Sequence, residues 1–108
     1  MAIDYEAARR IIYQYVSEVK AVFPIDKVYI YGSFVNGTAQ WDSDIDLCFF
    51  SDSFTQENIF FIIGRLFELK RQYNKIFCLE PNAFPLSELY NDNPFVKEIL
   101  RTGQEIFV

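Results

Sequence analysis

The chain has 108 residues, the usual length of a single domain, and no linker or low-complexity stretch divides residues 1–108. Apolar residues make up 51% of the sequence, which excludes an intrinsically disordered chain. The net charge of −5 argues against strong nucleic-acid binding, and the absence of histidine excludes catalysis by Ser-His or Cys-His pairs and histidine-containing zinc sites.

The first half of the chain predicts a helix followed by two strands. Apolar residues recur at helical spacing over residues 4–23, and Asp4 is the expected N-cap. Residues 27–31 are rich in β-branched and aromatic side chains and lead into Gly32, which indicates a strand that ends in a turn. A polar stretch separates this strand from a second one at residues 44–50, whose apolar end is typical of a buried sheet.

The second half predicts a long helix, a third strand and a short final helix. Helical spacing extends over residues 56–73 behind a capping Thr55. Three aromatic side chains of this helix are expected in the core: Phe60, Phe61 and Phe67. The remaining elements are a strand at 75–80 that stops at Pro81, a helix at 93–101 that ends before Gly103, and a short edge strand at 105–108. This order indicates an α+β domain with a small mixed β-sheet.

Cysteine usage and hydropathy indicate the setting of the protein. Cys48 and Cys78 are not part of a CxxC motif and no secretory leader precedes them, so both are expected to be reduced, small core residues on strands. The longest apolar stretch, residues 59–63, is too short to span a membrane. We therefore expect a soluble protein of the cytoplasm.

Two aspartates on the second predicted strand form the arrangement with the clearest chemical meaning. Asp44 and Asp46 stand two positions apart, so on a strand both carboxylates point to one face while Ile45 and Leu47 point to the core. Two carboxylates this close repel each other unless a proton or a divalent ion lies between them. Oxygen ligands favour Mg²⁺ or Mn²⁺, and we expect Mg²⁺.

A glycine-serine turn precedes this aspartate pair. Gly32 lets the chain turn sharply, and Ser33 at the start of a following helical turn offers a hydroxyl and backbone N–H groups to an anion. Gly37 provides a second position where the backbone can approach a ligand closely. The sequence leaves open which of three cations supports the anion: Lys27, Arg65 or Lys75.

The combined pattern resembles the signature of the DNA polymerase β superfamily of nucleotidyltransferases, and in particular its minimal nucleotidyltransferase (MNT) members. The resemblance implies the palm fold of that superfamily, with helices packed on one side of the sheet. It also implies transfer of a nucleoside monophosphate from a nucleoside triphosphate, with ATP favoured, to a hydroxyl acceptor. The positions that match the nucleotide-binding part of the signature are Gly32, Ser33, Gly37 and Ser43.

The resemblance further implies two Mg²⁺ ions, with Mn²⁺ as a substitute, held by three catalytic carboxylates. Asp44 and Asp46 are the first two, and the third lies on a later strand, where Glu80 is the carboxylate so placed. The chain departs from the superfamily at two positions. Glu80 stands where aspartate is common, and Asn36 stands where many relatives carry a basic residue that neutralises phosphate charge.

Partners also follow from the resemblance. In MNT/HEPN pairs the nucleotidyltransferase acts as the antitoxin beside a helical ribonuclease toxin, so a HEPN-type protein is the expected partner and acceptor. Two alternatives stay open. One is a catalytically weak module that neutralises a helical partner by contact, and the other is a nucleotidyltransferase that modifies a small molecule such as an antibiotic. A homo-oligomer is also compatible with the sequence.

Overall fold

The computed structural model describes residues 3–40 and 42–107. The elements of these residues are, in chain order, α1 (Tyr5–Val22), β1 (Lys27–Tyr31), α2 (Ser33–Asn36), β2 (Ile45–Ser51), α3 (Ile59–Lys70), η1 (Arg71–Tyr73), β3 (Leu79–Pro85), η2 (Leu86–Leu89), α4 (Pro94–Thr102) and β4 (Gln104–Ile106), where η denotes a 3₁₀ helix. The first helix confirms the predicted cap, because the side chain of Asp4 accepts a hydrogen bond from the N–H of Ala7 at 3.1 Å.

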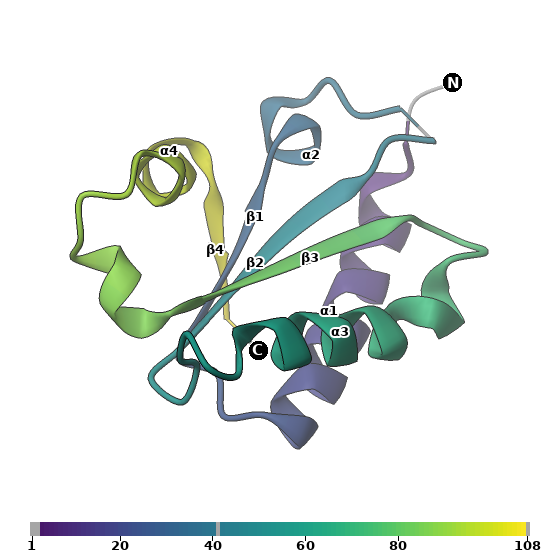
Figure 1. Cartoon of the computed structure of the whole chain (residues 1–108). Coiled ribbons are helices and arrows are strands. Elements are labelled where there is room, and N and C mark those ends of the chain that lie inside the picture. Colours follow the sequence, from purple (N-terminus) through teal and green to yellow (C-terminus); the bar gives the residue numbers. More distant parts are fainter. Residues whose placement is uncertain (1–2, 41, 108) are drawn as a thin grey trace.

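The strands form one mixed sheet in the order β3-β2-β1-β4 (Figure 1). β1 pairs antiparallel with both β2 and β4, whereas β2 pairs parallel with β3. The parallel pair follows from the long connection through α3, which returns the chain to the same end of the sheet. This mixed sheet with helices confirms the predicted α+β class.

The helices divide between the two faces of the sheet. α1 and α3 lie together on one face, as expected (Figure 1). The strand residues that face them form the main core and are almost fully buried: Val28, Ile30, Ile45, Leu47, Phe49 and Leu79. The short helix α4 lies on the opposite face, where its Val96 and Ile99 cover Cys48 and Phe50. The expectation of helices on one side holds for the two long helices, and α4 adds partial cover to the other face.

The third strand was predicted to begin four residues too early and to end five residues too early. It spans Leu79–Pro85 rather than residues 75–80, so Pro81 does not stop it. Pro81 is tolerated because β3 is an edge strand, where a missing N–H breaks no ladder. The N–H of Ile45 donates to the carbonyl of Cys78, so the backbone groups of Cys78 face β2. Because the direction alternates along a strand, the backbone groups of Pro81 and Pro85 point to the open edge.

The second long helix was also predicted too long. Thr55 and Asn58 exchange hydrogen bonds, from the N–H of Thr55 to Asn58 Oδ1 at 2.8 Å and from the N–H of Asn58 to Thr55 Oγ1 at 3.2 Å. Because these two residues form a local turn, helix α3 begins only at Ile59. The prediction that the phenylalanines of this helix lie in the core is wrong, since the exposed fractions are 83% for Phe60 and 71% for Phe61. The buried stripe of α3 consists instead of Ile62, Leu66 and Lys70.

The C-terminal elements lie close to their predicted places. α4 begins behind Asn93, whose side chain accepts hydrogen bonds from two backbone N–H groups, and ends before Gly103 as predicted. The edge strand spans Gln104–Ile106 rather than residues 105–108, and Val108 lies outside the described residues. In the described part of the chain, no helix combines the length and apolar character needed to cross a membrane.

Candidate active site

The turn after β1 has the geometry that the glycine-serine pattern predicts. Gly32 caps α2 with φ +81° and ψ −150°, a conformation that is essentially confined to glycine. α2 then begins at Ser33, and Gly37 ends it in the left-handed conformation with φ +78°. The first N–H groups of a helix have no acceptor within the helix. The turn therefore presents Ser33 and Phe34 backbone donors beside the end of β1.

The carboxylate of Asp46 lies directly against this turn. A Cβ atom at Gly32 would stand 2.5 Å from Asp46 Oδ2, so only glycine leaves room for the carboxylate. On its other side, Asp46 is paired in register with Glu80 of β3. Because paired positions on neighbouring strands point to the same face, the Gly32 turn and the carboxylates of Asp46 and Glu80 meet at one place on the sheet.

Asp44 extends the cluster at the start of β2. The potential ligand atoms of Asp44, Cys78 and Glu80 all lie within 4.8 Å of one another. Asp44 is exposed, whereas Cys78 and Glu80 are half-buried. Asp46, which is paired in register with Glu80, adds a third carboxylate next to this group. This donor set fits a divalent cation such as Mg²⁺ or Mn²⁺.

The electrostatics of the cluster show an excess of negative charge. Burial, together with the neighbouring charges of Asp44 and Glu80, raises the pKa of the Asp46 carboxyl. Burial and a hydrogen bond to Asp44 likewise raise the pKa of the Cys78 thiol. Burial and the nearby Cys48 and Asp46 raise the pKa of Tyr31, which keeps its hydroxyl neutral. Positive charge brought by a bound ion would relieve this repulsion.

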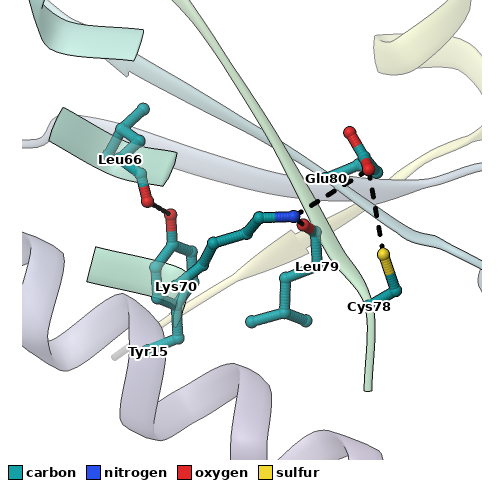
Figure 2. A network of polar contacts seen from close by, with 6 residues as sticks. All are labelled: Tyr15, Leu66, Lys70, Cys78, Leu79 and Glu80. Atoms are coloured by element: carbon teal, nitrogen blue, oxygen red, sulfur yellow. Dashed lines mark hydrogen bonds and ion pairs between the residues drawn. The ribbon is translucent and has the colours of Figure 1, made fainter. Parts of the chain in front are cut away.

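One buried cation reaches the cluster from α3. Lys70 is 7% exposed, and its Nζ donates to the carbonyl of Leu79 at 2.7 Å and lies 3.9 Å from Glu80 Oε1. Figure 2 shows this ammonium group between the strand and the carboxylate, with the thiol of Cys78 pointing at the same carboxylate. Lys70 therefore fixes both the backbone before Glu80 and one side of its carboxylate.

A cleft of about 450 Å³ opens beside the turn. Gly32 and Asn36 line it from the turn, and Phe95 and Arg101 line it from α4. In this structure Arg101 is paired with Glu98, with contacts of 3.2 and 2.5 Å. The cleft thus combines an aromatic wall, an exposed guanidinium group and the backbone of the turn.

The three cations considered from the sequence lie away from this cleft. Lys27 sits at the opposite end of β1 and pairs with Glu105 at 3.4 Å, and Arg65 pairs with Glu68 at 3.0 Å. Lys75 is exposed in the turn before β3. None of the three lines the cleft. Arg101 lines the cleft instead, and Lys70 lies beside the carboxylate of Glu80.

Ser43 has a local role in the loop that leads to Asp44. Its Oγ accepts a hydrogen bond from the N–H of Gln40 at 2.9 Å, and its own N–H donates to the carbonyl of Gln40 at 3.0 Å. Ser43 therefore closes the turn that sets the start of β2. Contact between Ser43 and a nucleotide stays a prediction.

Two residues of the site were missed by the sequence analysis. Lys70 lies four positions after Leu66, on the buried stripe of α3. This spacing could have identified it from the sequence, because a buried lysine needs a polar or acidic partner. Cys78 was expected in the core, but it is half-buried and faces Glu80, with which it shares a strand face. Cys48 is fully buried, as expected.

Comparison with known proteins bears on the family and the fold of this chain. The family profile described as "Polymerase beta, Nucleotidyltransferase" matches residues 9–108. No match was found among curated proteins. The chain is similar in structure to a proposed nucleotidyltransferase from Sulfolobus solfataricus, with a TM-score of 0.54 and 20% sequence identity over 91% of this chain and 78% of the other. At this identity the structural likeness shows the fold.

Proposed function

Because the chain belongs to the polymerase beta nucleotidyltransferase family, we propose that it transfers a nucleoside monophosphate from a nucleoside triphosphate, ATP by preference, to a hydroxyl acceptor. One observation carries the proposal. Asp46 on β2 is paired in register with Glu80 on β3 while it also contacts the Gly32 turn. The reaction of this family needs carboxylates beside a phosphate-binding turn, and the contact between Asp46 and the Gly32 turn supports the proposal.

The three carboxylates have separate roles in this proposal. Asp44 and Asp46 would hold two Mg²⁺ ions, or Mn²⁺ as a substitute, on the open side of the sheet, and Glu80 would complete the set from the neighbouring strand. Divalent ions there would neutralise the triphosphate and favour the deprotonated form of the attacking hydroxyl. Lys70 holds Glu80 in place through the contacts at its carboxylate and at the preceding carbonyl.

The cleft beside the turn is the proposed nucleotide site. Its walls bring the backbone of Gly32 close to the guanidinium group of Arg101. A planar guanidinium group recognises phosphate oxygens through paired hydrogen bonds. Arg101 would exchange Glu98 for the triphosphate and supply the positive charge that Asn36 lacks. The ring of Phe95, against which Tyr31 packs edge-on at 5.7 Å, offers an apolar wall for the nucleoside.

The acceptor is proposed to be a hydroxyl of a helical partner protein of the HEPN type. The described residues are taken up by the sheet, its helices and the turn, which leaves the acceptor side to another molecule. The exposed rings of Phe60 and Phe61 on α3 provide apolar surface that a partner could cover. Partner and acceptor follow from the family resemblance, and the exposed rings are compatible with them.

The test is transfer of label from ATP that carries ³²P at the α-phosphate. The purified chain is incubated with this ATP, Mg²⁺ and the product of the neighbouring gene, which is the candidate partner. We expect label on the partner with the wild-type chain and none with Asp44→Asn/Asp46→Asn. Asp52→Asn is the control for loss of an aspartate charge outside the cluster, because this exposed aspartate lies just past the far end of β2. A partner that stays unlabelled while it forms a stable complex would overturn transfer and favour neutralisation by contact.

A further inference from the structure

The thiol of Cys78 lies between two of the proposed metal-binding carboxylates. Its Sγ is 3.8 Å from Glu80 Oε1, and a carboxylate oxygen of Asp44 lies within 4.8 Å of it. All three ligand atoms lie within 4.8 Å of one another. The second cysteine, Cys48, is fully buried beneath α4 and is not part of this group.

The separation of Cys78 Sγ and Glu80 Oε1 is close to the ligand spacing of a thiophilic metal ion. A tetrahedral Zn²⁺ ion with ordinary bond lengths places sulfur and oxygen ligands about 3.5 Å apart, close to the separation between Cys78 and Glu80. Mg²⁺ makes no use of a sulfur ligand, because it is a hard cation that binds oxygen. The same pocket therefore offers oxygen donors to a hard ion and a mixed sulfur-oxygen set to a softer one.

We propose that Asp44, Cys78 and Glu80 form a site for a thiophilic divalent cation of the Zn²⁺ or Cd²⁺ class, and that its occupation excludes Mg²⁺. The exclusion rests on the proposed function, since Asp44 and Glu80 serve both sites. On binding, the Cys78 thiol releases its proton to solvent and its sulfur donates an electron pair to the metal, with no change of oxidation state. A thiophilic ion thus blocks nucleotidyl transfer.

The charge around the cluster supports a divalent ion at this place. Two carboxylates and one thiolate carry three negative charges. The ammonium group of Lys70, 3.9 Å from Glu80 Oε1, and a divalent cation carry three positive charges. The neighbouring Asp46, whose pKa is raised, adds a further negative charge when it is ionised, so the cluster without an ion carries an excess of negative charge that a divalent cation offsets.

Co²⁺ is the probe for this site, because a thiolate ligand gives Co²⁺ an intense charge-transfer band in the near ultraviolet. The chain contains no histidine and only two cysteines, so an untagged protein in a thiol-free reductant has few competing ligands. We expect the band in the wild-type chain and in Cys48→Ser, the matched control. In Cys78→Ser we expect no band and a Co²⁺ affinity at least about tenfold lower. Asp46→Asn should keep the band, because Asp46 is not one of the three ligands.

The outcomes separate this inference from the proposed function. A band that survives Cys78→Ser, or that is lost in Cys48→Ser, overturns the thiolate site, as does the absence of any band in the wild-type chain that transfers nucleotide. A wild-type chain that shows the band but never labels an acceptor with nucleotide overturns the proposed function and leaves the thiophilic site standing. Excess Mg²⁺ should weaken the band, and Zn²⁺ should displace Co²⁺. A band that Mg²⁺ does not weaken would contradict the proposal that the two metal ions use the same carboxylates.

Discussion

The backbone of Gly32 and the carboxylate of Asp46 touch so closely that no side chain fits between them: a Cβ atom at Gly32 would lie 2.5 Å from Asp46 Oδ2. Gly32→Ala should therefore displace the carboxylate as well as strain the turn, at a cost of about 1–3 kcal/mol in stability. We expect Mn²⁺ affinity, measured by calorimetry, to fall about tenfold or more.

Gly37→Ala is the control for the Gly32 variant. Gly37 has nearly the same positive φ, but a Cβ atom there meets no atom within 4 Å. This variant should lose about 1–2 kcal/mol through backbone strain alone and should bind Mn²⁺ like the wild type. Equal loss of Mn²⁺ affinity in both variants would show that strain in the turn, rather than contact with Asp46, controls the site.

The stability of the metal-free chain should depend on the charge of Asp46. Because the pKa of this carboxyl is raised in the folded state, folding favours the protonated form. Its stabilising contribution is complete below the unfolded pKa of about 3.9 and is lost as the pH rises through the folded value. Asp46→Asn should therefore raise the Tm by a few degrees at pH 7.5 and by less at pH 4.5. Mg²⁺ should raise the Tm of the wild type more than that of the variant. A Tm difference between Asp46→Asn and the wild type that does not change with pH would show that the charge of Asp46 does not destabilise the folded chain.

Sequence patterns predicted the parts of the fold that local periodicity controls. The 4–23 helix, the 27–31 strand and the turn at Gly32 follow from spacing and from glycine chemistry, and Asp44 and Asp46 follow from the alternation of a strand. The bounds of β3 did not follow, because Pro81 ends a strand only where its N–H is needed, and the edge position of β3 arises from tertiary pairing. Glu80 came from the family resemblance rather than from local pattern.

The placement of Lys70 illustrates the same limit. Its helical position on a buried stripe is visible in the sequence, but its partner, the carbonyl of Leu79, is set by the packing of α3 on the sheet edge.

Lys70→Met leaves the carbonyl of Leu79 without a donor and Glu80 without a counter-ion. We expect a loss of about 1–3 kcal/mol in the free energy of unfolding, measured in urea. Exposed Lys75→Met should change it by less than about 0.5 kcal/mol. Equal stability of the two variants would show that Lys70 has no structural role.

Arg101 should determine nucleotide affinity without affecting the fold. Its side chain is 70% exposed, and Glu98, with which it forms an ion pair, lies on the same helix. Arg101→Gln removes the guanidinium group from the cleft, and loss of a charged contact to phosphate should weaken ATP binding about tenfold or more. The matched control is Arg10→Gln, which breaks a similar exposed pair with Glu6 on α1. Equal ATP affinity in the two variants would place the triphosphate elsewhere.

The most direct test of the account measures binding of a non-transferable ATP analogue, with a methylene group between the α- and β-phosphorus atoms, to the isolated chain by calorimetry. The account predicts binding that requires Mg²⁺ or Mn²⁺ and that Asp44→Asn/Asp46→Asn abolishes, while Asp52→Asn binds like the wild type. Binding that is unchanged without divalent ions, or that survives in the double variant, would contradict a metal-dependent nucleotide site built on these carboxylates.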